Sequence, residues 1–255
     1  RPKKQTPGTD FSGVVTKVGS DVTNFQVGEE VFGFDDNIIS TQAEFFVIKA
    51  TGNVMAKPTN ISHLYAAASI EGAHYALNGY KIAKTKPGDE VLVYGATGAI
   101  GSAAVQIARA MDATVDAVAN TENLDLVSNL GADKVYDYLT EDYTDSTKKY
   151  DLIWDAVGKT SYSKCRHMLK EKGNYISSEL GKNGINIWLA LTNKNVKFPM
   201  PTDIKASLEY MKNLLIQGDF MPVIDRYYPL EDIKQAYKYV SSGKKTGNVI
   251  LKIEK

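Results

Sequence analysis

The sequence has 255 residues, a length that favours two domains. With 43% hydrophobic and 24% charged residues, its composition is that of an ordinary globular protein. Its 30 basic and 30 acidic side chains cancel, and this argues against nucleic-acid binding through a basic surplus. The single cysteine, Cys165, excludes an intrachain disulfide and a four-thiolate zinc site and favours a cytoplasmic location. No hydrophobic run approaches the length of a membrane span, so we expect neither nucleic acid nor a membrane as partner.

The first part of the chain predicts a small all-β unit. β-forming residues cluster between glycines in FSGVVTKVG, EEVFGF and AEFFVIKA, without the spacing of strand–helix–strand units. The opening RPKKQTPGTDF has no initiator methionine and no signal-peptide pattern, so we expect it to lie inside a longer sequence. The pattern then becomes helical in NISHLYAAASIEGAHYALNGYKIAK, and KPGDE ends that helix.

From Glu90 onward, predicted strands alternate with predicted helices, which indicates a parallel, doubly wound sheet in an α/β fold. The expected strands are EVLVYG, TVDAVAN, KVYDY, YDLIWDAVG and NYISSEL. The expected helices between them are AIGSAAVQIARAM, ENLDLVSNLGA and YSKCRHMLKEKG. Two amphipathic helices, DIKASLEYMKNLLIQGDF and LEDIKQAYKYVSSGKK, precede a closing strand, TGNVILKIEK.

A glycine turn, Gly95–Gly101, directly follows one of these strands and begins a helix. Such a turn lets a diphosphate approach backbone N–H groups at a helix N-terminus, where the dipole favours negative charge. Gly98 and Gly101 occupy the last two positions of the GxGxxG pattern, and Ala96 occupies the first. The sequence therefore favours a dinucleotide site that includes Thr97, although a tight turn without a ligand remains the alternative.

The end of the following strand bears on the choice of dinucleotide. An acidic residue about 20 positions after the turn would bind the ribose 2′-hydroxyl of NAD. Asn120 and Thr121 stand near that place, and both have side chains that can donate to a 2′-phosphate. Glu122 argues the other way, because it can accept from a 2′-hydroxyl or support the next helix. We predict NADPH, with NADH as the alternative.

Several stretches resemble the medium-chain dehydrogenase/reductase superfamily, and specifically its zinc-free quinone oxidoreductase-like branch, also labelled NAD(P)-dependent alcohol dehydrogenase-like. They are PGTDFSGVVTKVGSDVTNFQVGEEVFGF, DEVLVYGATGAIGSAAVQIARAM, LGADKVYDY, YDLIWDAVGKTSYSKC and DRYYPLEDIKQAYKYVSSGKKTGNVILKI. The resemblance implies a GroES-like β domain at residues 1–75 that lacks its opening strands, a Rossmann domain at 76–200, and a return at 201–255 that completes the β domain.

The resemblance also implies where the cofactor would be bound. The pyrophosphate is expected at Gly98, Ala99, Ile100 and Gly101, and the adenosine ribose or its phosphate at Asn120 and Tyr138. The nicotinamide side is expected at Ala156, Val157, Gly158, Ser178, Glu179 and Asn248. Glu122 departs from some NADPH-using relatives, which have Lys or Arg nearby. A homodimer is compatible with the family, whose members pair through the edge of the Rossmann sheet.

No motif in the sequence indicates a metal site or a nucleophile. His63, His74 and His167 are widely spaced, and neither the GxSxG elbow nor a P-loop occurs. We predict hydride transfer from NAD(P)H to a small electrophile that needs little polarisation, a quinone or a conjugated carbonyl, with no catalytic residue assigned. The alternatives are an alcohol or aldehyde dehydrogenase of the same superfamily and a non-catalytic nucleotide-binding protein.

Overall fold

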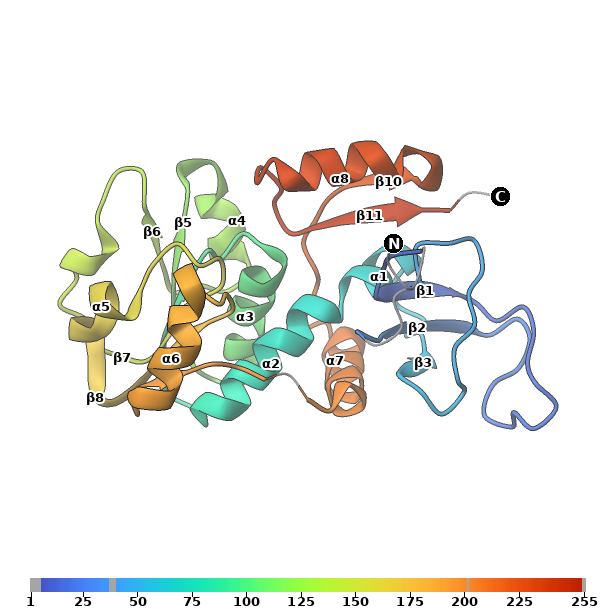
Figure 1. The fold of residues 1–255 in the computed structure, drawn as a ribbon, viewed down its shortest axis with the longest axis horizontal. Coiled ribbons are helices and arrows are strands. Elements are labelled where there is room, and N and C mark those ends of the chain that lie inside the picture. The colour runs from blue at the N-terminus through green and yellow to red at the C-terminus, as the bar shows by residue number, and fades with distance from the viewer. Residues whose placement is uncertain (1–5, 37–39, 201, 254–255) are drawn as a thin grey trace. The chain divides into compact units, whose positions relative to one another are not determined.

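The computed structural model describes residues 6–36, 40–200 and 202–253 (Figure 1). The chain divides into two compact units. One unit combines Arg1–His74 with Asp203–Lys255, and the other is Tyr75–Thr202. The expected domain boundaries, after residues 75 and 200, lie close to the boundaries of these units.

The unit Tyr75–Thr202 is built on a parallel sheet of six strands in the order β6-β5-β4-β7-β8-β9 (Figure 1). This is the order of a Rossmann fold, and it reverses between β4 and β7, where such folds bind their ligands. The predicted doubly wound α/β sheet is confirmed. The strands are β4 Glu90–Tyr94, β5 Thr114–Ala119, β6 Lys134–Asp137, β7 Tyr150–Asp155, β8 Leu169–Ser177 and β9 Val196–Lys197.

Helices connect these strands, and the longest of them that lies wholly within the unit, α3 (Ala99–Ala110), is buried from residue 101 to residue 108. Small residues allow this burial, because alanine and glycine let a helix approach a sheet closely. The sheet beneath is filled by large apolar side chains, including Leu92, Ile153, Trp154 and Tyr175. The remaining helices are α2 Glu71–Ala83, α4 Leu124–Asn129, α5 Tyr162–Cys165 and α6 Ile185–Thr192, with 3₁₀ turns η1 Thr121–Asn123, η2 Tyr143–Asp145, η3 Arg166–Met168 and η4 Lys182–Gly184.

The other unit contains an antiparallel sheet, β1-β2-β3, and a separate parallel pair, β10-β11. Its buried side chains include Phe32 and Phe34 on one face of β2, and Phe11 on the opposite face, where it lies against Gly33. The elements are β1 Asp10–Val14, β2 Glu30–Phe34, β3 Val54–Ala56, β10 Ile224–Pro229, β11 Asn248–Lys252, α1 His63–Ala68, α7 Ile204–Gln217, α8 Ile233–Ser241 and the 3₁₀ turn η5 Leu230–Asp232.

Two predicted elements are wrong. AEFFVIKA (residues 43–50) forms no strand in the described part of the chain, and Phe45 and Val47 are 57% and 92% exposed. The predicted helix YSKCRHMLKEKG ends after α5 and η3, because residues from Leu169 onward form β8. Helix α6 was not predicted at all.

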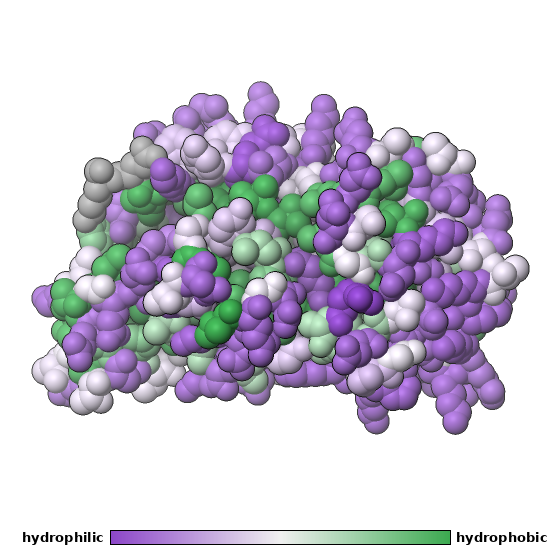
Figure 2. Space-filling model, turned by 180° about the vertical axis from the view of Figure 1, so that it is seen from behind, coloured by the Kyte–Doolittle hydropathy of each residue, from purple (hydrophilic) through white to green (hydrophobic). Residues whose placement is uncertain are grey.

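The described residues contain no helix that is both long enough and apolar enough to cross a membrane. Hydrophilic residues predominate on the face shown in Figure 2, and hydrophobic residues form patches between them.

Candidate functional site

The glycine turn lies at the carboxyl end of β4, beside the point where the strand order reverses. Gly95 has a φ of +81°, a left-handed conformation that favours glycine. The N–H groups of Gly95 and Ala96 both donate to the Val118 carbonyl of β5, at 3.2 and 3.3 Å. The Gly98 N–H closes the turn by donating to the Gly95 carbonyl at 3.2 Å. The turn is therefore held on two neighbouring strands of the sheet.

Gly98 and Gly101 differ in what surrounds them. A Cβ on Gly101 would lie 2.1 Å from the Gly95 oxygen and 2.9 Å from the Ala96 Cα, so only glycine lets α3 pack on the turn. A Cβ on Gly98 would meet only the Gly95 oxygen, at 3.7 Å, and the φ of Gly98 is −75°, which any residue adopts. The protein itself therefore gives no steric reason for glycine at position 98.

Gly98 is also the N-cap of α3, and its Cα faces open space. It has no side chain to cap the helix, and the first turn contains no acidic residue. The first N–H groups of a helix have no partner within the helix, and the helix dipole makes this end positive. The predicted residues Ala99 and Ile100 form this first turn. The geometry suits an anion such as the pyrophosphate of a dinucleotide.

Asn120, Thr121 and Tyr138 follow the last residues of β5 and β6, so all three lie at the carboxyl end of the parallel strands. Thr121 donates from its hydroxyl to Asp137 at 2.5 Å, and the Tyr138 N–H donates to the last residue of β5 at 3.1 Å. Asn120 accepts through Oδ1 from Asn123 at 2.7 Å, and its amide nitrogen has no partner among the described residues. Tyr138 is 49% exposed.

Asp137, which the sequence analysis did not single out, organises this corner. It is the last residue of β6 and is buried, and one carboxylate oxygen accepts from the Leu139 N–H at 3.0 Å. The hydroxyl of Thr121 is the main cause that lowers the pKa of this carboxyl. Asp137 is therefore engaged by its own loop. Its position at a strand end, before a turn, was the available signal.

Asp155, also missed, holds the loop that contains Ala156, Val157 and Gly158. It is the last residue of β7 and is fully buried, and burial raises its pKa despite several hydrogen bonds to backbone N–H groups. Its Oδ1 accepts from the Val157 and Lys159 N–H groups at 3.2 and 3.3 Å. Its Oδ2 accepts from the Thr160 N–H at 3.3 Å and from the Tyr175 hydroxyl at 3.2 Å.

The structure brings this loop against two other predicted segments. Val157 covers the glycine turn, since a Cβ on Gly95 would lie 2.6 Å from its side chain. Gly158, with a φ of +66°, touches Glu179, whose Cγ would lie 2.8 Å from a Cβ at that position. Three predicted segments, 95–101, 156–158 and 178–179, are therefore close together.

Ser178 is fixed from both sides at the end of β8. Its N–H donates to the Asp155 carbonyl at 2.9 Å, and its hydroxyl accepts from the Trp154 indole N–H at 3.0 Å. Asn248 belongs to the other unit, where it begins β11 and donates from its amide to the Val223 carbonyl at 3.0 Å. The structure thus gathers every predicted cofactor residue except Asn248 into one unit.

Two further side chains that could react, Cys165 and His167, are each hydrogen-bonded within the protein. Cys165 is fully buried, its Sγ lies 3.2 Å from the Thr160 hydroxyl, and burial raises the pKa of the thiol. The His167 Nε2 lies 2.8 Å from the Thr144 carbonyl. Within residues 6–36, 40–200 and 202–253, no three His, Cys, Asp or Glu side chains are grouped to hold a metal ion.

Two family models match the chain. Residues 1–59 match the alcohol dehydrogenase GroES-like domain, and residues 130–251 match a model described as zinc-binding dehydrogenase. The fold is shared with a solved quinone oxidoreductase from Coxiella burnetii. That structure has a TM-score of 0.84 and 24% identity, and the match covers 99% of this chain and 81% of that one. The expected GroES-like β domain is confirmed.

Curated relatives agree with these matches. A chloroplast envelope quinone oxidoreductase homolog from Arabidopsis thaliana is 30% identical, and the match covers 96% of this chain and 79% of that protein. A 2-methylene-furan-3-one reductase from Solanum lycopersicum is 30% identical, with 98% and 64% covered. A chloroplastic NADPH-dependent alkenal/one oxidoreductase from Arabidopsis thaliana is 28% identical, again with 98% and 64% covered. The chain therefore spans slightly less than two thirds of the length of the last two.

A Rossmann sheet with a glycine turn at its switch point defines a dinucleotide-binding protein. The chain belongs to the medium-chain dehydrogenase/reductase superfamily, in its quinone oxidoreductase-like branch, and so to the NAD(P)H-dependent oxidoreductases. The family resemblance drawn from the sequence is confirmed.

Proposed function

We propose that the protein transfers hydride from NADPH to a quinone or to the conjugated double bond of an enone or enal, without a catalytic zinc ion. The observation that carries the proposal is the open space above Gly98 at the N-terminus of α3. The chain has a glycine there although packing permits a side chain, and the close approach of a diphosphate accounts for this choice. The substrate class is supported by the names of the relatives, a quinone oxidoreductase homolog and two reductases of conjugated carbonyls.

In this proposal the predicted residues have distinct tasks. The backbone of residues 97–101 binds the pyrophosphate, and Asn120, Thr121 and Tyr138 surround the adenosine ribose. Residues 156–158 and 178–179 orient the nicotinamide, because Asp155 and Trp154 fix the two loops that carry them. Asn248 is proposed as a further cofactor contact on the basis of the family resemblance alone.

Two observations support NADPH over NADH. Both Asp137 oxygens are engaged by neighbouring groups, so this carboxylate is not offered to a 2′-hydroxyl. The Asn120 amide nitrogen has no partner among the described residues, so it can donate to a 2′-phosphate. One relative is named as NADPH-dependent. Glu122, exposed beside these residues, opposes the phosphate and limits the preference.

The cofactor supplies the hydride when bound, and the chain supplies orientation and a water-poor surface. The β-carbon of an enone or a quinone carbonyl accepts the hydride, and the developing oxyanion is then protonated. Substrates of this class need less polarisation than an isolated ketone. The sequence has no histidine pair or cysteine group spaced as a zinc-ligand motif, and this agrees with such a substrate.

Fluorescence titration with NADPH and NADH tests the cofactor, and turnover with quinones, enones, aldehydes and alcohols tests the reaction. We expect saturable NADPH binding and oxidation of NADPH by quinones or enones, unchanged by a chelator. A full-length folded protein that binds neither cofactor contradicts the whole proposal. Binding without turnover would instead indicate a non-catalytic nucleotide-binding protein.

We infer further that two copies pair through the outer strand β9 of the parallel sheet and the helix α6 beside it. In the described part of the chain β9 is an edge strand paired only with β8, and its Val196 N–H donates to the Asn193 carbonyl at 3.0 Å. The adjacent helix α6 exposes Trp188 at 59% and Leu191 at 82%, which is unusual for a lone surface helix. A cytoplasmic location, tested by cell fractionation, is part of the same proposal.

A further inference from the structure

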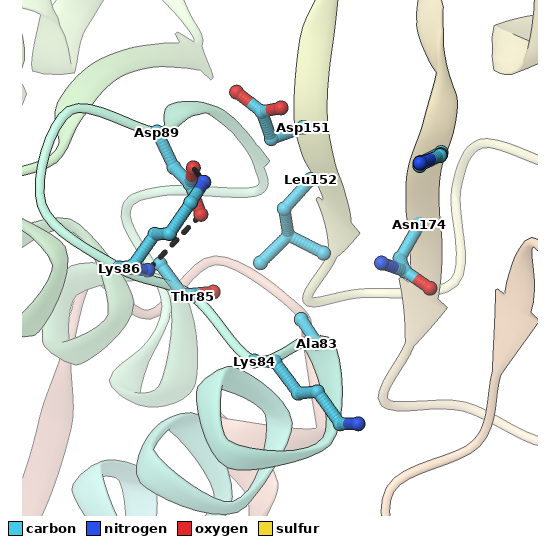
Figure 3. Close-up of a pocket in the computed structure, with 9 residues that line it drawn as sticks. Ala83, Lys84, Thr85, Lys86, Asp89, Asp151, Leu152 and Asn174 are labelled. Carbon is cyan, nitrogen blue, oxygen red and sulfur yellow. Dashed lines mark hydrogen bonds and ion pairs between the residues drawn. The ribbon is translucent and has the colours of Figure 1, made fainter.

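A pocket of about 140 Å³ opens at the amino end of the parallel strands (Figure 3). The glycine turn lies at the other, carboxyl end of these strands. Three stretches of the chain form it: the end of α2 with the loop that follows, the second and third residues of β7, and the middle of β8. A cavity of about 150 Å³ holds a molecule the size of benzene, so there is room for one small ligand. The lining residues are Ala83, Lys84, Thr85, Lys86, Asp89, Asp151, Leu152, Lys172 and Asn174.

The acidic groups of the pocket are already neutralised. Asp89 accepts from both the side chain and the backbone N–H of Lys86, at 2.5 and 3.0 Å. Asp151 accepts from the Lys170 ammonium at 2.6 Å and from the Glu90 N–H at 2.9 Å. Each carboxylate is therefore paired with a lysine, and both bonds to Asp151 fall on its Oδ2.

The groups left without partners can donate hydrogen bonds. The side chains of Lys84, Lys172 and Asn174 have no hydrogen-bond or ion-pair partner within the described ranges. The Thr85 hydroxyl is buried and also has none. In Figure 3 this hydroxyl points toward Leu152, and the Asn174 amide nitrogen points toward the same side chain from β8. A buried hydroxyl without a partner is costly, but the Thr85 oxygen is closed to solvent, so the donors open to the pocket are the two lysines and the Asn174 amide.

Lys84 has an unfavourable backbone conformation at the pocket wall. Its φ is +57°, the left-handed region that normally holds glycine or asparagine after a helix. The turn that imposes it is made by the Thr85 N–H, which donates to the Tyr80 carbonyl at 3.1 Å. Lysine at this position is explained if its ammonium group is used.

We propose that this pocket binds a phosphate group, either as inorganic phosphate or as the phosphate of a small monoester. The lining carries three lysines and two aspartates. Lys170, which is paired with Asp151, adds a fourth positive charge. The surplus of two positive charges matches a dianion. The oxygens of phosphate can accept from the separate donors open to the pocket, namely two ammonium groups and an amide. The site is independent of the cofactor proposal, because it lies at the amino end of the parallel strands and the glycine turn lies at their carboxyl end.

Thermal unfolding tests the proposal with inorganic phosphate, compared with sodium chloride at equal ionic strength. A ligand that binds the folded state raises the Tm in a saturable manner. We expect phosphate to do so and chloride not. Glucose 6-phosphate identifies the source, because a larger shift than that of inorganic phosphate indicates a monoester. If neither phosphate compound raises the Tm beyond the chloride control, the proposal is wrong.

Two variants locate the binding. Lys84→Asn removes the charge but retains a residue that accepts the left-handed conformation, and Lys172→Gln removes the second charge from β8. Each is expected to weaken phosphate binding by up to about tenfold, as for an exposed lysine that faces a dianion. Lys234→Gln, on α8 of the other unit, is the matched control and retains the full response. An equal response in all three variants would show that phosphate binds elsewhere, and this would overturn the assignment.

Discussion

Alanine substitution of Gly98 and of Gly101 is predicted to give opposite phenotypes, although the two glycines belong to one motif. In Gly98→Ala the new methyl group meets only the Gly95 oxygen at 3.7 Å, in a conformation open to alanine. The fold is retained, with a loss of about 0.5–1 kcal/mol because alanine is a poor N-cap. The methyl group occupies the space proposed for the pyrophosphate. If it displaces one charge-assisted hydrogen bond of about 1.5–3 kcal/mol, NADPH affinity falls roughly 10- to 150-fold.

Gly101→Ala acts on the fold itself. Its methyl group would lie 2.1 Å from the Gly95 oxygen and 2.8 Å from the Gly95 carbonyl carbon, which are backbone atoms that cannot rotate away. Helix α3 must move off the turn, at a cost of about 1–3 kcal/mol or more. We expect a clear fall in Tm for this variant, and a loss of binding that follows the loss of structure.

The two outcomes are separated by chemical denaturation and by NADPH fluorescence titration of the same preparations. Gly98→Ala should unfold close to the parent and bind weakly, whereas Gly101→Ala should unfold early. The reasoning would be refuted if Gly98→Ala bound NADPH with the parent affinity, because the open space at position 98 would then have no connection with the cofactor.

Three further predictions concern other parts of the same unit. Glu122→Lys should tighten NADPH about five- to tenfold relative to NADH, an effect that high salt reduces, and an unchanged ratio of the two dissociation constants would contradict the proposed position of the 2′-phosphate. Asp155→Asn should cost about 1–3 kcal/mol, because buried donors lose an acceptor. Burial raises the pKa of Asp155, so the free energy of unfolding of the parent falls as pH rises from about 4 through that pKa. The Asn variant does not titrate there. The difference in free energy of unfolding between parent and variant, measured by denaturation, should therefore shrink over the same pH range. Combined replacement of Trp188 and Leu191 by glutamate should give a monomer in light scattering, and an unaltered mass would exclude the α6 edge as the dimer contact.

The sequence predicted the parallel sheet well because its strands are buried on both faces and appear as continuous apolar runs, as in Glu90–Tyr94. It failed where burial and pattern disagree. The first half of β8 has three consecutive exposed residues, 170–172, so it lacks both the apolar run and the alternation of a strand. Helix α6 is apolar around most of its surface, and no polar face marked it as a helix.

The candidate site shows the same division between what a motif indicates and what packing decides. The glycine turn was found because two glycines at fixed spacing have a mechanical meaning. Asp137 and Asp155 were missed because a single aspartate at a strand end has many uses. The structure shows that the Asp155 carboxylate accepts from three N–H groups of the loop that follows it, and that the Asp137 carboxylate accepts from the Leu139 N–H and from the Thr121 hydroxyl. Replacement of such a carboxylate should therefore move a whole loop rather than a single contact.

The preference between the two cofactors depends on this corner more than on any motif. Thr121 is predicted from sequence to donate to a 2′-phosphate, but its hydroxyl already donates to Asp137. Thr121 can donate to the 2′-phosphate only if its bond to Asp137 breaks. The Asp137 carboxylate would then lie close to the phosphate without that donor. The Asn120 amide is free of such competition. Asn120→Ala should therefore weaken NADPH more than Thr121→Val does, and the reverse order in titrations would show that Thr121 releases Asp137 when the cofactor binds.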